Sequence, residues 1–397
     1  MSDREVLAQL RAELGHALDT TDASLEAARA DKSGHASTGR PLAVVRARNV
    51  EDVQATLRIA SVTGTPVVTR GAGTGLAGGA NAGPGEIALS VRAMDRIVEG
   101  RPDDLLAVVE PGILNADLNR ALAEYGLWWA PDPASRDIST VGGNIATGAG
   151  GLLCAKYGVV RDAVLGVDIV LADGRLLHLG HRTVKGVTGL DLTSLVIGSE
   201  GILGVVVGAT LKLRRLVPGE VCTIAATFTD VGTAASACSA VTATGLQPAI
   251  MELLDAAALT AIHELLGLAA PTPGAAHVTI QTDGAAAAAD AAAITAVLEA
   301  AGGTVAVSTD RDEGERLLKE RTRQPVVSVR PKELRGALDS VTTAPKMPKA
   351  LSREEKAAMR RTRRALGEEE DARARSARRR PRRRGASRRG DRAGAPR

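Results

Sequence analysis

A run of glycines limits what residues 70–79 can fold into. The segment reads Arg-Gly-Ala-Gly-Thr-Gly-Leu-Ala-Gly-Gly and follows Val67-Val68, a short apolar run that predicts a strand. A loop this rich in glycine can turn several backbone N–H groups toward one point, and it lets an anion approach without Cβ atoms in the way. The segment therefore predicts a cradle for a diphosphate, although an ordinary glycine-rich turn would produce the same string.

The segment also satisfies the pattern G-x-G-x-x-G at residues 73–78, so a nicotinamide-binding Rossmann unit has to be considered. That unit needs a helix that begins inside the motif, because the helix N-terminus holds the pyrophosphate. Here the chain continues to residue 85 as Gly-Ala-Asn-Ala-Gly-Pro-Gly, and glycine and proline at that density do not form a helix. The context therefore excludes the Rossmann interpretation.

Strands and helices alternate around this segment, which is typical of an α/β opening. Apolar residues at helical spacing predict a helix within residues 3–30, and Asn49 is the expected N-cap of a second helix that ends at Gly64. Short apolar runs predict the strands, and a further helix is expected before Gly126. The predicted strands are 41–45, 67–68, 86–91 and 105–109, and the helix is 115–125.

Two more segments rich in glycine follow. Residues 139–151 expose backbone and carry hydroxyl groups, and they come shortly after Pro131-Asp-Pro-Ala-Ser135. Residues 198–204 lead into a β-rich run at 205–213. Between them, Asp173-Gly174 predicts a tight turn that joins two strands, at 164–171 and 175–179.

Pro218 marks a boundary, after which the pattern is βαβ-like. Helices and strands alternate again, and an alanine-rich helix carries a packing face. The predicted strands are 223–229, 277–281 and 304–307, and the predicted helices are 231–244, 257–266 and 285–301.

The three glycine-rich segments, taken in order, resemble the FAD-binding domain of the vanillyl-alcohol-oxidase-type flavoproteins. Within that family, the resemblance is to the glycolate oxidase flavoprotein subunit and to the FAD-linked D-lactate and D-2-hydroxyglutarate dehydrogenases. The resemblance is dense over 40–215 and loose over 216–320. It implies an α+β fold, in which a two-part FAD-binding domain precedes an incomplete α+β cap domain and a disordered basic tail. The expected parts are an N-terminal helical segment at 1–35, the FAD-binding domain at 36–217, the cap at 218–330 and the tail at 331–397.

The resemblance also implies which residues hold the cofactor. The glycine-rich loop would bind the FAD diphosphate through backbone N–H groups, the second segment would line the flavin and ribityl side, and the third would contact the cofactor through its backbone. Thr74 stands where covalently flavinylated relatives carry a histidine, so the FAD is expected to be non-covalent. The cofactor-binding residues so assigned are Arg70, Gly71, Ala72, Gly73, Thr74, Gly75, Pro131, Ser135, Thr140, Gly143, Asn144, Thr147, Glu200, Gly201 and Ile202.

The remaining candidates favour structural roles. His178 and His181 have no accompanying cluster of cysteines or carboxylates, so no metal site is expected. Lys185 and Asp191 fit a surface pair as well as a catalytic one, and Trp128-Trp129 fits core packing better than stacking on a flavin. The His-containing cap motif of the resembled family is missing, so the catalytic residues stay unassigned.

The C-terminal tail carries the basic charge of the chain. Residues 371–397 hold 12 Arg and 2 Asp, which leaves 38 basic and 44 acidic side chains elsewhere. These residues contain no Val, Ile, Leu, Met or aromatic side chain, so ordering them would bury almost nothing. We expect disorder from about residue 352, or a frayed helix at 352–366, and out-of-frame coding explains the composition better than nucleic-acid binding does.

The resemblance implies an FAD-dependent dehydrogenase that transfers a hydride from a small 2-hydroxy acid, such as D-lactate or glycolate, to flavin N5. The alternative is a flavin-binding but inactive polypeptide or a subunit of a larger complex. The electron acceptor and any partner subunits stay open. Three widely spaced cysteines and the lack of an apolar span or leader favour a cytoplasmic location without a transmembrane segment.

Overall fold

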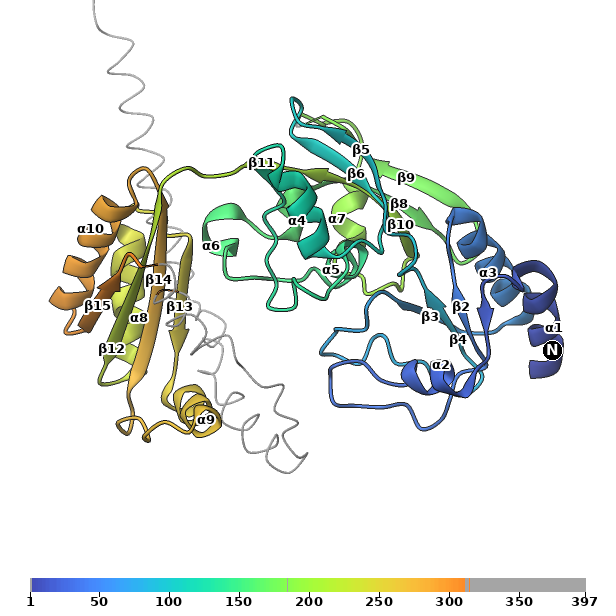
Figure 1. Ribbon diagram of the computed structural model, residues 1–397, viewed down its shortest axis with the longest axis horizontal. Helices are drawn as coiled ribbons and strands as arrows, with labels where there is room; N and C mark the ends of the chain where they lie inside the picture. The colour runs from blue at the N-terminus through green and yellow to red at the C-terminus, as the bar shows by residue number, and fades with distance from the viewer. Residues whose placement is uncertain (1, 184, 311–313, 315–397) are drawn as a thin grey trace, which may run out of the picture. The chain divides into compact units, whose positions relative to one another are not determined.

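The first sheet carries the glycine-rich loop at its edge. The computed structural model describes residues 2–183, 185–310 and 314. This sheet has the order β1-β2-β4-β3, and both β2 and β3 run parallel to β4 (Figure 1). Since β3 ends at Arg70, the loop leaves from the carboxyl end of a parallel strand. The strands are β1 (Leu18–Asp19), β2 (Ala43–Arg46), β3 (Val67–Arg70) and β4 (Ile87–Ser90).

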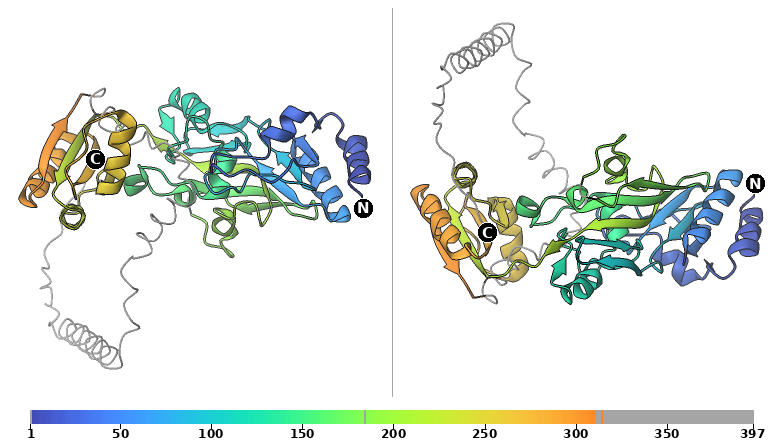
Figure 2. Two further views of the ribbon diagram at one scale, coloured as in Figure 1. Left: turned by 90° about the horizontal axis from the view of Figure 1, so that it is seen from below. Right: turned by 90° about the horizontal axis from the view of Figure 1, so that it is seen from above.

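One of the two helices beside this sheet, α3, begins and ends where its sequence predicts. The Asn49 side chain accepts a hydrogen bond from Asp52 N and so caps α3 (Val50–Thr63), and Gly64 ends the helix at φ +70°. Helix α1 (Asp3–Leu14) lies next to α3 (Figure 2) and buries one face, formed by Val6, Leu10 and Leu14. The prediction of the capped helix before the glycine-rich loop is confirmed.

The helix predicted within residues 3–30 is interrupted after Leu14 and forms two separate helices. Leu18 pairs with Val45 in the first sheet, so the chain is extended at β1 instead of helical. The Asp19 carboxylate then accepts hydrogen bonds from Thr21 N and Ser24 Oγ, which favours a turn into a separate helix, α2 (Asp22–Ala27). Pairing with a distant strand therefore outweighs the local helical pattern.

The second sheet is antiparallel and holds the largest core cluster, which includes the fully buried Trp129. Its order is β5-β6-β10-β8-β9, and β8 and β9 form the hairpin that Asp173-Gly174 predicts. Strand β5 escaped prediction, because its residues are mostly exposed and carry no apolar alternation. The strands are β5 (Ile97–Arg101), β6 (Leu106–Val109), β8 (Val164–Val170), β9 (Leu176–Gly180) and β10 (Val205–Lys212), with the pair β7 (Leu127–Trp128) and β11 (Arg214–Arg215) nearby. The helices here are α4 (Asn115–Ala123), α5 (Val141–Thr147), α6 (Cys154–Tyr157), η1 (Val160–Ala163) and α7 (Leu192–Val196).

The third sheet has the order β13-β14-β12-β15, with every neighbouring pair antiparallel. Apart from α9 in the connection between β13 and β14, the chain order is β-α-β-β-α-β, which with this strand order is a split βαβ arrangement. The βαβ-like prediction is therefore right in outline but missed β13. Helices α8 and α10 pack on this sheet and share its core (Figure 1). The elements are β12 (Glu220–Phe228), α8 (Val231–Ala243), β13 (Ile250–Leu254), α9 (Ala256–Leu266), β14 (Ala276–Gly284), α10 (Ala287–Ala300) and β15 (Thr304–Ser308).

The mixed helix and sheet architecture confirms the predicted α+β class. The expected disorder of the basic tail at 331–397 lies outside the described residues. Among the helices of the described part, none is long and apolar enough to cross a membrane.

Candidate functional site

Three loops from distant parts of the chain meet beside the first sheet. A side chain added at Gly71 would come within 2.4 Å of Thr140 Oγ1, and one added at Gly79 would lie 3.2 Å from Glu200 Oε2. The fold thus brings together the three segments that the sequence singles out. They are the glycine loop (residues 70–79), the second loop (residues 139–151) and the third loop (residues 198–204).

The glycine loop offers unused hydrogen-bond donors. Among the described residues, none accepts a hydrogen bond from the backbone N–H groups of residues 71–80. Gly73 is left-handed at φ +68°, and a Cβ there would lie 2.3 Å from Arg70 Nη2. The loop thus combines free N–H donors with backbone geometry that excludes side chains, which is the arrangement a bound anion requires.

Residues 141–147 of the second loop form the short helix α5, which the sequence does not predict. Thr140 caps this helix, with its Oγ1 3.2 Å from Gly143 N, and Thr147 Oγ1 donates to Gly143 O at 2.9 Å. Threonine followed by small residues can therefore nucleate a short helix despite the glycines. Both hydroxyl groups and the Gly143 N–H are used inside the helix.

Two buried polar atoms of the second loop have no partner. Asn144 is 3% exposed, and its Nδ2 makes no hydrogen bond within the described part of the chain. The same holds for the Oγ of Ser139, which is 2% exposed and which the sequence analysis does not include. A buried polar group without a partner is costly, so both atoms favour an additional ligand at this place. The position of Ser139 directly before the capping threonine is the one sequence signal for it.

The third loop is attached to the end of α5. Gly198 N donates to Ile145 O at 3.0 Å, and Glu200 N donates to Ala146 O at 2.8 Å. Glu200 and Gly201 both have positive φ angles, +52° and +85°. Ile202, the third predicted residue here, is 85% exposed.

The Pro131–Ser135 segment forms a turn that supports the second loop. Asn115 Nδ2 donates to Pro131 O at 2.9 Å, and Ser139 N donates to Ser135 O at 2.7 Å. Pro131 and Ser135 thus accept these hydrogen bonds through their backbone carbonyl groups.

Asp132 lies between them and holds the far end of the second loop. Its buried carboxylate accepts a hydrogen bond from Leu153 N at 3.0 Å, and a side chain at Gly151 would collide with it. Burial raises the pKa of Asp132 to about 6, against the opposing effect of the Leu153 N–H. Asp132 lies within the Pro131–Ser135 motif, but the resemblance assigns it no role in the site.

Comparison with known protein families matches two separate parts of the chain. Residues 41–180 match the family of the FAD binding domain, and residues 217–366 match that of the C-terminal domain of FAD linked oxidases. The chain belongs to the FAD-linked oxidases of the vanillyl-alcohol-oxidase type. FAD is therefore its cofactor.

Similar proteins are FAD-linked enzymes of several organisms. Glycolate oxidase subunit GlcD of Bacillus subtilis is 39% identical over 244 residues, which are 62% of this chain and 52% of that protein. D-2-hydroxyglutarate dehydrogenase of Stutzerimonas stutzeri is 38% identical over 217 residues, 54% of this chain and 46% of that protein. A probable mitochondrial D-lactate dehydrogenase of Danio rerio is 37% identical over 237 residues, 59% and 47% of the two chains. The chain spans about half the length of the curated relatives that it matches.

A solved structure of alkyldihydroxyacetonephosphate synthase shares the fold. Its TM-score is 0.66 at 18% identity, over 80% of this chain and 63% of that one. The predicted two-domain FAD-linked oxidase fold is thereby confirmed.

The site of this FAD-linked oxidase fits the cofactor chemically. A diphosphate needs several converging donors, and the glycine loop provides free N–H groups with glycine at residues 71, 73, 75, 78 and 79. The buried Asn144 amide adds an unused donor beside it. The residues present therefore suit FAD.

The other candidates of the FAD-linked oxidase have structural partners. Trp129 is fully buried and donates to Ala163 O at 2.9 Å, so it packs in the core as expected. Asp191 caps α7 by accepting from Ser194 N at 2.9 Å, and His178 Nδ1 lies 2.7 Å from Asp168 Oδ1. Within the described ranges, no three His, Cys, Asp or Glu side chains are placed to hold a metal ion.

A charged and aromatic cluster follows the second loop. Tyr157 of α6 donates to the Asp283 carboxylate, which also pairs with the Lys156 ammonium group. The Tyr157 ring meets Trp128 edge to face at 5.0 Å, and the Arg214 guanidinium lies 5.3 Å from the Tyr157 ring centroid. Burial and the Asp283 carboxylate both raise the pKa of Tyr157. This cluster connects the helix after the second loop to β14 of the third sheet.

Proposed function

We propose that this chain is an FAD-dependent dehydrogenase that oxidises a small 2-hydroxy acid such as D-lactate or glycolate. The meeting of three glycine-rich loops beside unused backbone donors carries the proposal, because a diphosphate needs such donors. The substrate class is supported by the names of the relatives, which are 37–39% identical to parts of this chain. When bound, FAD supplies the two-electron oxidant.

In this proposal, the chain's own residues bind and orient the cofactor. The N–H groups of the glycine loop donate to the diphosphate, Asn144 Nδ2 donates to a polar group next to α5, and the backbone of the third loop packs against the cofactor. Thr74 lacks a nucleophile comparable to histidine, so the FAD is held non-covalently. The proposed cofactor residues are those of the sequence analysis with Ser139 added.

We also propose that residues 36–217 bind FAD and that residues 218–330 form the substrate-side cap. The family matches at 41–180 and 217–366 support this division, although the second match runs past residue 330. A cytoplasmic location is supported by three free thiols at Cys154, Cys222 and Cys238, since free thiols persist in reducing compartments.

Reconstitution and dye reduction test the proposal. The purified chain is mixed with FAD, freed of excess cofactor and supplied with an artificial dye as electron acceptor. We expect dye reduction with at least one of D-lactate, glycolate and D-2-hydroxyglutarate, and a lower rate with L-lactate. A chain that retains FAD but reduces the dye with none of these acids would overturn the assigned activity and leave the cofactor assignment in place.

A further inference from the structure

The Arg70 side chain spans the base of the glycine loop. Its Nη1 donates to Ala80 O at 2.7 Å and its Nη2 donates to Ala30 O at 2.8 Å. The guanidinium is partly buried, and this burial lowers the pKa of Arg70 while the nearby Asp31 carboxylate opposes the effect. The two terminal nitrogens of the arginine therefore hold the carbonyl directly after the loop and a carbonyl of residues 28–37.

Residues 28–37 form a supporting segment on the outside of the same loop. Lys32 N donates to Gly75 O at 3.0 Å, and Asn81 Nδ2 donates to His35 O at 2.9 Å. Ser37 Oγ donates to Asn81 O at 3.2 Å. The first contact uses the Gly75 carbonyl of the loop, and the other two involve Asn81 just beyond it, so the N–H groups of the loop stay free.

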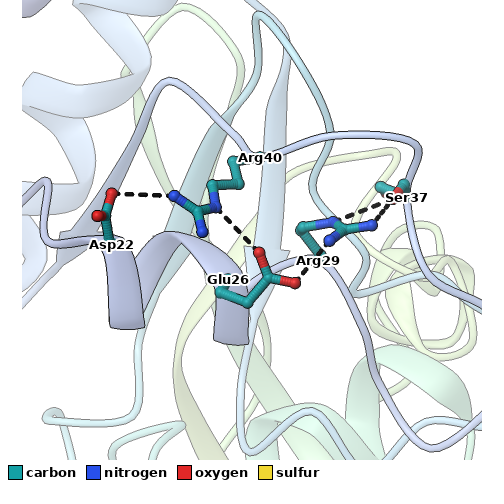
Figure 3. Close-up of polar contacts among 5 residues, drawn as sticks. All are labelled: Asp22, Glu26, Arg29, Ser37 and Arg40. Atoms are coloured by element: carbon teal, nitrogen blue, oxygen red, sulfur yellow. Dashed lines mark hydrogen bonds and ion pairs between the residues drawn. The ribbon is translucent and has the colours of Figure 1, made fainter.

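The supporting segment is itself fixed by an arginine. Arg29 donates through Nε and Nη2 to Ser37 O, at 3.1 and 2.7 Å, and pairs with Glu26 (Figure 3). Arg40 bridges Glu26 and Asp22 of α2 in the same network (Figure 3). Side chains outside the glycine loop thus hold the supporting segment in place.

We propose that Arg70 is a positioning residue of the FAD site and that residues 28–37 are the outer wall of the diphosphate cradle. The supporting segment lies before residue 41, where the match to the FAD binding domain begins. This role of Arg70 rests on the proposed placement of the diphosphate at the glycine loop. The guanidinium keeps the loop open and its N–H groups directed at the cofactor, and it is not the charge that binds the diphosphate.

The physical basis is the fork of the guanidinium. Arginine presents several donors in a fixed plane and can hold two carbonyls at once, whereas lysine carries a single point of charge. A loop held in its binding conformation loses less entropy when the ligand arrives, so fixing it raises affinity without a direct contact. Replacement of Arg70 by lysine keeps the charge and removes the fork.

The FAD affinity of three variants tests the role of Arg70. The variants are R70K, R70A and the control R175K, and their affinity is measured by quenching of flavin fluorescence at low and high salt, without substrate. Arg175 is exposed and pairs with Asp173 in the hairpin turn. We expect both Arg70 variants to lose roughly tenfold or more in affinity, by the same factor at both salt concentrations, and R175K to match the wild type. Wild-type affinity in R70K, with a loss in R70A that shrinks at high salt, would show a direct charge contact and overturn the proposal.

R29K provides a second route should the Arg70 variants fail to fold. Lysine at this position cannot hold Ser37 O with two donors, so we expect R29K to have a weaker FAD affinity. Millimolar methylguanidinium should restore the FAD affinity of R70A partly but not that of R29K. Unchanged FAD affinity in R29K would remove the supporting segment from the site. All these measurements omit the hydroxy acid, so a wild type that binds FAD but does not turn over would contradict the proposed activity alone.

Discussion

Replacing Gly73 by alanine should damage the glycine loop in two ways. The residue has φ +68°, and alanine in the left-handed region costs about 1–2 kcal/mol. Its Cβ would also lie 2.3 Å from Arg70 Nη2, so the guanidinium must move. Losing one of its two hydrogen bonds costs about 1.5–3 kcal/mol, since the donor is charged. Together the free energy of unfolding should fall by about 2.5–5 kcal/mol.

Gly85 provides the matched control. It has φ +76°, but nothing lies within 4 Å of a Cβ added there. G85A should therefore lose only the backbone contribution of about 1–2 kcal/mol. Urea unfolding of both FAD-free variants, followed by circular dichroism, measures the difference. A difference below about 1 kcal/mol would refute the claim that the Arg70 guanidinium is fixed against Gly73.

Three further changes test other contacts. Asp132 binds its proton more tightly when folded, because burial raises its pKa from 3.8 to about 6. The contribution of Asp132 to the free energy of unfolding is therefore full below about pH 4 and is lost as the pH rises through 6. Urea unfolding of the wild type should show a loss of about 3 kcal/mol between these pH values. D132N keeps an acceptor for Leu153 N and should remove this pH dependence, so an unchanged slope would contradict the pKa shift. N49A should cost about 1 kcal/mol by urea unfolding through the lost cap of α3, and no loss would place the helix start elsewhere. In a double-mutant cycle of Y157F and D283N, we expect a coupling energy of about 0.5–3 kcal/mol, and additive effects would show that this hydrogen bond contributes nothing.

The sequence alone determines where some helices and turns begin and end, because those ends depend on neighbouring residues. Asn49 and Gly64 limit α3 because a cap and a left-handed glycine act within one turn of the helix. Asp173-Gly174 closes a hairpin for the same kind of reason. The glycine-rich motif likewise predicts a cradle for a diphosphate, because glycines let backbone N–H groups approach an anion without Cβ atoms in the way.

Tertiary structure decided which groups meet. Leu18 is a strand residue because it pairs with Val45, and no local pattern contains that partner. No local pattern predicts that Arg70 donates to the carbonyls of Ala30 and Ala80, at separations of 40 and 10 residues. Hydrogen bonds between distant backbone groups leave no periodic trace in the sequence, whereas caps and turns do. The three loops therefore could be recognised one by one from their residues, and only the packing of the sheets joined them into a single site.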